Sequence, residues 1–488
     1  MAEEAAAQRA GERGVKNTLI RAVGEIVGKL ASLLLFAALA RSAGQEGLGA
    51  FVLAFAFLQI AMVPIDLGFD RYLIREVARD RARADELVFN VLALRLSMAV
   101  PIIGLSFLAV NLLGYDAEVR ETVYVLAGGL LIDLLTKTVL SFCLAHERND
   151  LVAISVVVQR VGSAALGLAL LGAGYGVVAV AASYTAGSAV GFVLACALTA
   201  RAIGTPRLEA SGRGWRRLTA ASFPFAAEDV FTVLLFRVDA VILSLMAAEA
   251  AVGRYGAAYR LLEATFFLTY SLSGAFSPMY AYLTRESEPT VGAVYQRSIN
   301  FALVVLVPCA ISFGILAEPL CELFFGDDFA AAADPLRLLA PVVVLLCVAT
   351  LSSALIVSRR DPRIMIAITG AMVALNVALN VALIPEFDDT GAAAAMLGTE
   401  LVMVAIVLSV AARVVGGLRW VPLLVAPLLA GAAMAGPMLA LEDSFAAALA
   451  VGMAVYAVVL LAVERVTNPA ELRFVGNMIG RLRGRVAA

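Results

Sequence analysis

Fourteen stretches of about 20 mostly apolar residues follow one another along the chain. A helix of that length spans the hydrocarbon core of a bilayer. The stretches lie near residues 18–40, 50–69, 87–110, 122–145, 151–171, 176–200, 219–246, 256–283, 299–324, 336–357, 363–384, 391–412, 420–440 and 444–463. Short loops connect them and leave no room for a soluble catalytic domain. The pattern predicts an all-α polytopic membrane protein with fourteen transmembrane helices.

The composition supports a membrane protein and argues against an enzyme. Hydrophobic residues make up 62% of the chain and charged residues 16%, whereas a soluble protein has about 45–50% and about 25%. The net charge of −2 gives no electrostatic case for a nucleic-acid partner. The five cysteines form no C-x-x-C pair, and His146 is the single histidine. No nucleotide-binding or nucleophile motif occurs. We therefore expect no catalytic residue, no metal site and no cofactor.

The positions of Lys and Arg predict the orientation, because cytoplasmic loops of membrane proteins are enriched in them. With the N-terminus in the cytoplasm, most loop Lys and Arg residues fall on the cytoplasmic side. The opposite side then holds only Arg41, Arg120, Arg254 and Arg337. An even number of spans places both termini on the same side. We expect cytoplasmic N- and C-termini.

Two pairs of similar turns suggest that the first twelve spans form a repeat of six. The turn EGLGAF contains Gly49 and the turn AAVGRY contains Gly253, and each glycine precedes an aromatic residue by two positions. The turns HERND (146–150) and SRRDPR (358–363) lie a similar distance apart. Repeats of this size are typical of transporters. The predicted divisions are an N-terminal segment (1–17), an N-lobe (18–200), a linker (201–218), a C-lobe (219–412), two further spans (420–463) and a basic tail (464–488).

Segments at the start of both halves resemble the oligosaccharide (polysaccharide, O-antigen-type) flippase family. They read GQEGLGAFVLAFAFLQ (44–59), DLGFDRYLIREVAR (66–79), RVDAVILS (237–244) and VGRYGAAYRLLE (252–263). The wider superfamily of multidrug, oligosaccharidyl-lipid and polysaccharide exporters also contains the multidrug-and-toxin exporters and the lipid II flippases. The resemblance implies two six-helix lobes in a V around a central cavity, with two C-terminal helices added. It also implies alternating-access transfer of a polyprenyl-diphosphate-linked oligosaccharide to the outer leaflet of the cell membrane. Membrane lipids, and the glycosyltransferases and polymerase of the same pathway, are the partners that it implies.

Seven cations fall inside the apolar spans, where each would cost about 2.5–3.5 kcal/mol facing lipid. Most of them must therefore face the bundle interior or a wet cavity. They are the candidate substrate-binding residues Arg21, Lys29, Arg95, Lys137, Arg160, Arg237 and Arg260. Arginine can hold phosphate oxygens with two parallel hydrogen bonds. Counted by half, the first lobe carries a surplus of positive charge and the second a surplus of negative charge, so we expect the diphosphate to bind the first lobe.

Four acids are candidates for coupling transport to Na⁺ or H⁺, or for neutralising the cations: Glu25, Asp133, Asp239 and Glu263. Glu25 and Asp133 lie four residues before Lys29 and Lys137, which favours a counter-ion role. A structural network of Arg237, Asp239, Arg260 and Glu263 between the spans at 219–246 and 256–283 is an alternative to a binding role. Two other functions remain open, a multidrug cation antiporter and a lipid II flippase.

Overall fold

The structure is a computed structural model that describes residues 2–204, 215–283, 288–361, 363–417, 420–442 and 444–467. Side chains are described from residue 24 onward within these ranges, apart from 82, 224, 225, 228, 288, 289 and 420–422. Every regular element in this part of the chain is helical. The first ten α-helices are α1 (Ala2–Asp66), α2 (Phe69–Arg79), α3 (Ala84–Leu112), α4 (Ala117–Ala145), α5 (Asn149–Gly172), α6 (Val177–Ala202), α7 (Trp215–Met246), α8 (Glu249–Ala264), α9 (Phe266–Tyr282) and α10 (Glu288–Ile315). The others are α11 (Ala317–Phe325), α12 (Ala333–Leu339), α13 (Val342–Arg359), α14 (Arg363–Val414), α15 (Trp420–Ala440) and α16 (Phe445–Thr467), with short 3₁₀ turns at Arg81–Arg83 and Asp327–Ala332.

All fourteen predicted spans coincide with helices, which confirms the all-α polytopic fold. Ten helical segments of the described chain are long and apolar enough to cross a membrane. Two of them, Gly24–Arg79 and Arg363–Val414, contain two predicted spans each. The stretches predicted at 219–246 and 256–283 are also helical, as α7, α8 and α9, but they are not among those ten. They carry four of the charged residues described below, Arg237, Asp239, Arg260 and Glu263.

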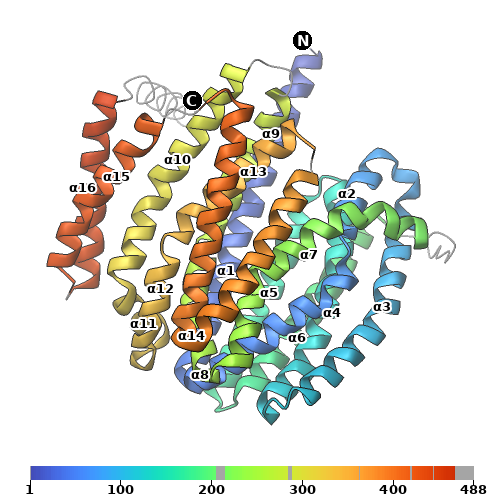
Figure 1. The fold of residues 1–488 in the computed structure, drawn as a ribbon. Coiled ribbons are helices and arrows are strands. Elements are labelled where there is room, and N and C mark those ends of the chain that lie inside the picture. The colour runs from blue at the N-terminus through green and yellow to red at the C-terminus, as the bar shows by residue number, and fades with distance from the viewer. Residues whose placement is uncertain are drawn as a thin grey trace. The chain divides into compact units, whose positions relative to one another are not determined.

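Sharp backbone breaks separate the paired spans. Inside α1, Gly44 has φ 68° and ψ −167°, a conformation that glycine adopts without a steric penalty. This break divides α1 into two helical segments, both drawn in blue in Figure 1. Inside α14 the break is at Asp388, with φ 47° and ψ −125°.

The chain forms two compact units that do not follow chain order. The first consists of Met1–Phe267, Phe324–Phe329 and Ile366–Ala395. The second consists of Leu268–Leu323, Ala330–Met365 and Met396–Ala488. The lobe boundaries remain a prediction. Most of the predicted linker (205–214) and of the predicted tail (468–488) lies outside the described residues.

In the second unit, α15 and α16 pack along each other and against α10 (Figure 1). The hydroxyl of Tyr456 on α16 donates a hydrogen bond to the Val304 carbonyl of α10 at 2.9 Å. Close approach of α15 and α16 uses Gly452, since a Cβ at that position would lie 2.5 Å from Cγ of Met438. The two predicted C-terminal spans are therefore integrated into this unit.

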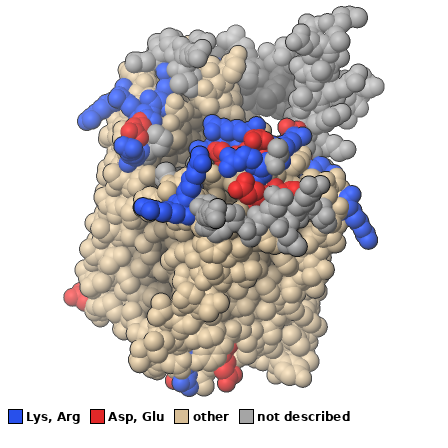
Figure 2. Space-filling model, turned by 90° about the vertical axis from the view of Figure 1, so that its right-hand side faces the viewer, with Lys and Arg blue, Asp and Glu red and all other residues tan. Residues whose placement is uncertain are grey.

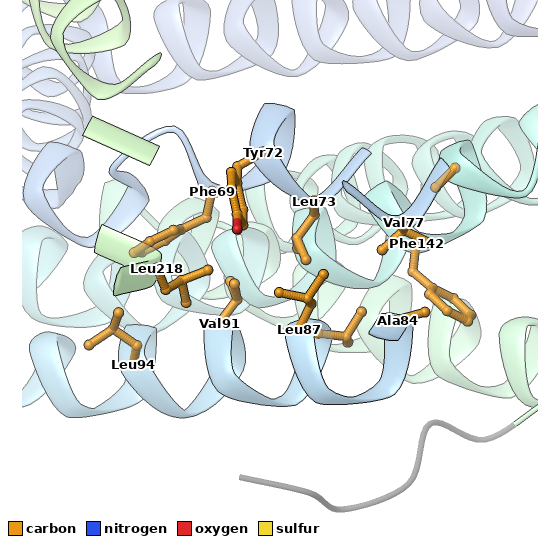
Figure 3. Close-up of a cluster of buried hydrophobic side chains, with 12 residues drawn as sticks. Phe69, Tyr72, Leu73, Val77, Ala84, Leu87, Val91, Leu94, Phe142 and Leu218 are labelled. Carbon is orange, nitrogen blue, oxygen red and sulfur yellow. The ribbon is translucent and has the colours of Figure 1, made fainter. Parts of the chain in front are cut away.

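In the first unit, α2 is a short amphipathic helix. Its residues Phe69, Tyr72, Leu73 and Val77 are buried against α3, α4 and α7 (Figure 3). Its basic residues Arg71, Arg75 and Arg79 have side chains 46%, 44% and 69% exposed. Figure 2 shows one face of the molecule, on which Lys and Arg gather towards one end above a broad uncharged surface. This arrangement suits a helix lying at a membrane surface.

Candidate functional site

The candidate site is a cavity of about 690 Å³ that lies entirely within the first unit. Helices α1, α2, α4, α5, α6, α7 and α8 supply its wall. Apolar and aromatic side chains form much of the surface, including Phe36, Phe51 and Phe55. The charged residues of the wall are Glu25, Lys29, Asp66, Asp70, Asp133, Lys137, Asp229, Arg160, Arg237, Arg260 and Glu263.

On one part of the wall, α1 and α5 contribute an ion pair. Nη1 of Arg160 donates to Oε2 of Glu25 at 2.9 Å. The guanidinium can cross α1 because Gly28 has no side chain, and a Cβ there would lie only 3.2 Å from Nη1 of Arg160. Lys29, one turn from Glu25 on α1, lines the same cavity, and its Nζ lies 6.0 Å from the ring centroid of Phe266.

Helices α7 and α8 complete this group with two arginines that share one carboxylate. Nη2 of Arg237 donates to Oε1 of Glu263 at 3.0 Å, and Nη1 of Arg260 donates to Oε2 at 2.6 Å. Arg260 and Glu263 are three residues apart and therefore lie on the same face of α8. The Arg260 guanidinium carbon is 3.5 Å from the ring centroid of Phe36 on α1.

These four cations, Lys29, Arg160, Arg237 and Arg260, form what we call the basic cluster. The carboxylates paired within it are Glu25 and Glu263. Within this cluster four positive charges stand against two negative ones, a formal surplus of two, whereas the whole cavity wall carries five Lys and Arg and six Asp and Glu side chains. A diphosphate diester carries two negative charges, so the charges of the cluster and of such a headgroup match.

The predicted site residue Arg95 occupies a different environment. Its side chain is fully buried, and it is not part of the cavity wall. Nη2 lies 2.6 Å from Oδ1 of Asp66 and 3.2 Å from Oδ1 of Asp70. Nη1 donates to the Leu134 carbonyl and to the Thr138 hydroxyl. The expectation that Arg95 lines the cavity is wrong, because these groups hold it between α1, α2 and α4.

Lys137 lines the cavity as expected, with its side chain 56% exposed. Its Nζ lies 3.5 Å from Oδ2 of Asp66, so Asp66 serves both Lys137 and Arg95. Asp66 and Asp70 together offset the charges of these two cations. The positive surplus of the first half is therefore smaller than the count from the sequence, because Asp66 and Asp70 belong to the same half. The basic cluster draws on both halves, with α1 and α5 from the first and α7 and α8 from the second.

Two of the four candidate coupling acids have no Lys or Arg as a hydrogen-bond partner among the described side chains. Asp133 accepts from the Tyr184 hydroxyl and, at 2.6 Å, from the Gln159 amide. Asp239 is 1% exposed and accepts from the Tyr255 hydroxyl at 2.9 Å and the Asn380 amide at 2.8 Å. Glu25 and Glu263 are instead the counter-ions of the basic cluster.

The structure thus brings together four of the seven predicted cations. Arg21 lies outside the described side chains. The sequence analysis missed Asp66 and Asp70, which also face the cavity, as does Asp229. A signal for the first two was present in the DLGFDRY segment, where two acids flank a glycine at the end of an apolar span. Within the described residues no group of three or more His, Cys, Asp and Glu is arranged to hold a metal ion.

Comparison with known proteins places this cavity in a family. The sequence model of the polysaccharide biosynthesis protein family matches residues 15–283, more than half of the chain. The chain belongs to this family. A second family model, MatE, matches residues 224–382. The predicted membership in the superfamily of multidrug, oligosaccharidyl-lipid and polysaccharide exporters is confirmed.

Individual relatives and solved structures are similar to this chain at 12–22% sequence identity. The probable low-salt glycan biosynthesis flippase Agl15 of Haloferax volcanii is 22% identical over 362 residues, which cover 73% of this chain and 74% of the relative. The fold is similar to that of the lipid II flippase MurJ in an inward closed conformation, with a TM-score of 0.74, 12% identity, and coverage of 92% of this chain and 99% of that one. The fold is also similar to that of an inward-facing multidrug resistance MATE transporter, with a TM-score of 0.67 and 14% identity. The match covers 81% of this chain and 98% of that one.

Proposed function

We propose that this protein is a flippase that moves a polyprenyl-diphosphate-linked oligosaccharide from the cytoplasmic to the outer leaflet of the cell membrane. The observation that carries the proposal is the basic cluster, in which four cations and two paired carboxylates gather on the wall of a cavity of about 690 Å³. The described similarity to a glycan flippase and to the lipid II flippase fold supports it. The proposal involves no covalent chemistry.

In this proposal the diphosphate binds among Lys29, Arg160, Arg237 and Arg260. Their position between apolar walls strengthens the attraction, because electrostatic interactions are larger where water is excluded. Lys137 lies elsewhere on the wall and contacts the first sugars, which expose hydroxyl groups rather than charge. Both termini are cytoplasmic, and the glycan is received from the glycosyltransferases and delivered to the polymerase of the same pathway.

Return of the empty carrier is driven by Na⁺ or H⁺ binding at Asp239. Burying an ionised carboxylate without a cation is unfavourable, so Asp239 gains from binding either ion. The Tyr255 hydroxyl and the Asn376 and Asn380 side chains around it supply neutral oxygen and nitrogen groups. Asp133, with Tyr184 and Gln159, is a second carboxylate of the same kind.

Reconstitution into vesicles tests the proposal. Vesicles with the full chain, loaded with a fluorescent polyprenyl-diphosphate oligosaccharide, are assayed for substrate that becomes accessible to an external glycosidase. We expect transfer that depends on the protein and on a Na⁺ or H⁺ gradient, and loss of the gradient dependence in Asp239→Asn. Preferred transfer of lipid II would support the lipid II flippase, and accumulation of cationic drugs without glycan transfer would support the antiporter.

A further inference from the structure

Glu263 occupies the position in the basic cluster that best fits an anion. Each of its two carboxylate oxygens accepts a hydrogen bond from a different guanidinium, Arg237 at 3.0 Å and Arg260 at 2.6 Å. A phosphate group bound by two arginines would use the same donors in the same bridging arrangement. The carboxylate and a phosphate therefore compete for one place.

Neighbouring groups fix both guanidiniums. Arg260 lies over the ring of Phe36, 3.5 Å from its centroid. Arg237 donates to Oε1 of Gln59, and its guanidinium carbon lies 5.5 Å from the ring centroid of Tyr259. Stacking on aromatic rings holds a guanidinium in one orientation. These contacts favour the orientation in which both arginines face Glu263, so a ligand would bind them where the carboxylate lies.

Another cation, Lys29, offers the Glu263 carboxylate an alternative position. The Lys29 side chain lines the same cavity, and its Nζ lies 6.0 Å from the ring centroid of Phe266, three residues after Glu263. The Glu263 side chain lines the cavity and is 22% exposed, so it is not locked in a packed core. A carboxylate displaced from the two arginines would remain next to a positive charge and would not be left unpaired.

We propose that Glu263 is a built-in competitor of the substrate diphosphate. In the empty protein it holds the anion place between Arg237 and Arg260, and the arriving diphosphate displaces it towards Lys29. This inference rests on the proposed function. Competition has two consequences for transport. It keeps the arginines paired while the carrier returns empty, since an uncompensated cation away from water is unfavourable. It also weakens diphosphate binding enough to permit release on the far side.

Binding measurements on the purified full chain in detergent test this role. The probes are inorganic pyrophosphate and farnesyl diphosphate, titrated by calorimetry at one fixed salt concentration. We expect Glu263→Gln to bind farnesyl diphosphate roughly tenfold more tightly than the wild type. The substitution removes the carboxylate that competes with the diphosphate for Arg237 and Arg260. Glu263→Asp keeps the charge but is shorter by one methylene, and its affinity should fall between the two.

The matched control is Glu25→Gln. It removes the same charge from the same cluster, but Glu25 pairs with Arg160 and does not bridge two arginines. The competitor role predicts a clearly smaller gain for Glu25→Gln than for Glu263→Gln. It also predicts that Glu263→Gln transfers glycan more slowly despite tighter binding, because release becomes limiting. Thermal unfolding with and without farnesyl diphosphate gives a second measure of affinity if the variants differ in stability.

The outcomes separate this inference from the proposed function. Unchanged or weaker binding in Glu263→Gln, or equal gains in Glu263→Gln and Glu25→Gln, would overturn the competitor role. If no variant and no wild-type sample binds either diphosphate, the proposed headgroup site itself is contradicted.

Discussion

Gly49 and Gly253, which occupy equivalent places in the two predicted repeats, lie against each other in the structure. A Cβ built on Gly49 would be 3.1 Å from the backbone nitrogen of Gly253 and would overlap the Glu249 carbonyl. A Cβ on Gly253 would overlap the Gln45 carbonyl in turn. Helices α1 and α8 therefore pack on each other through backbone atoms at these two glycines, and only glycine permits this approach.

Alanine at Gly49 or Gly253 should destabilise the protein. The added methyl group meets backbone that cannot rotate aside, and overpacking of this kind costs about 1–3 kcal/mol. Thermal unfolding of the detergent-solubilised protein measures the effect. Gly104→Ala and Gly162→Ala are controls in helices α3 and α5, where a Cβ would meet no atom within 4 Å. Equal unfolding temperatures for Gly253→Ala and the controls would refute the close contact.

An ion pair lies beside this glycine contact, and we expect it to stabilise the same end of the unit. Nε and Nη2 of Arg254 each donate to one oxygen of Asp389, at 2.9 and 3.0 Å, and Nη1 donates to Gln45 at 3.2 Å. A double-mutant cycle with Arg254→Gln and Asp389→Asn should give a coupling free energy of roughly 1–3 kcal/mol. Additive effects of the two substitutions on unfolding would show that the pair contributes nothing.

Arg95 and Lys137 share the carboxylate of Asp66, yet replacing them should lower the free energy of unfolding by different amounts. Arg95→Met removes a fully buried cation and leaves Asp66 and Asp70 without their main partner, which costs about 3–5 kcal/mol. Lys137→Met removes an exposed cavity residue and should cost less than about 1 kcal/mol. Thermal unfolding and the yield of folded protein distinguish them. A larger loss for Lys137→Met than for Arg95→Met would contradict the structural role of Arg95.

The apolar periodicity of the sequence was sufficient to predict the fold, because a bilayer requires long apolar helices whatever their neighbours. The counting of charges by half was not sufficient to predict the site. Asp66 and Asp70 follow or end an apolar span, so they were not counted as partners of Arg95. Only the break at Leu67 and Gly68, both with positive φ, turns α2 back so that Asp70 reaches the side chain on α3.

The basic cluster could not be predicted from the sequence either. Its members come from α1, α5, α7 and α8, and their proximity depends on tertiary packing that residue spacing cannot give. The sequence could predict which cations lie within the membrane spans. It could also predict that each must face a polar environment, since a cation facing lipid is unfavourable. The repeat glycines were visible in the sequence as well, but their mutual contact was not.

The central claim is that the basic cluster holds a diphosphate headgroup, and transfer of the lipid-linked oligosaccharide in vesicles tests it most directly. The variants are Lys29→Gln, Arg160→Gln and Arg260→Gln, with Arg148→Gln as the matched control because Arg148 pairs with Asp150 in a turn outside the cavity. Each cluster variant should lose roughly tenfold to a hundredfold in transfer at low substrate concentration, while Arg148→Gln stays near the wild type. Wild-type transfer rates in all three cluster variants would contradict the claim.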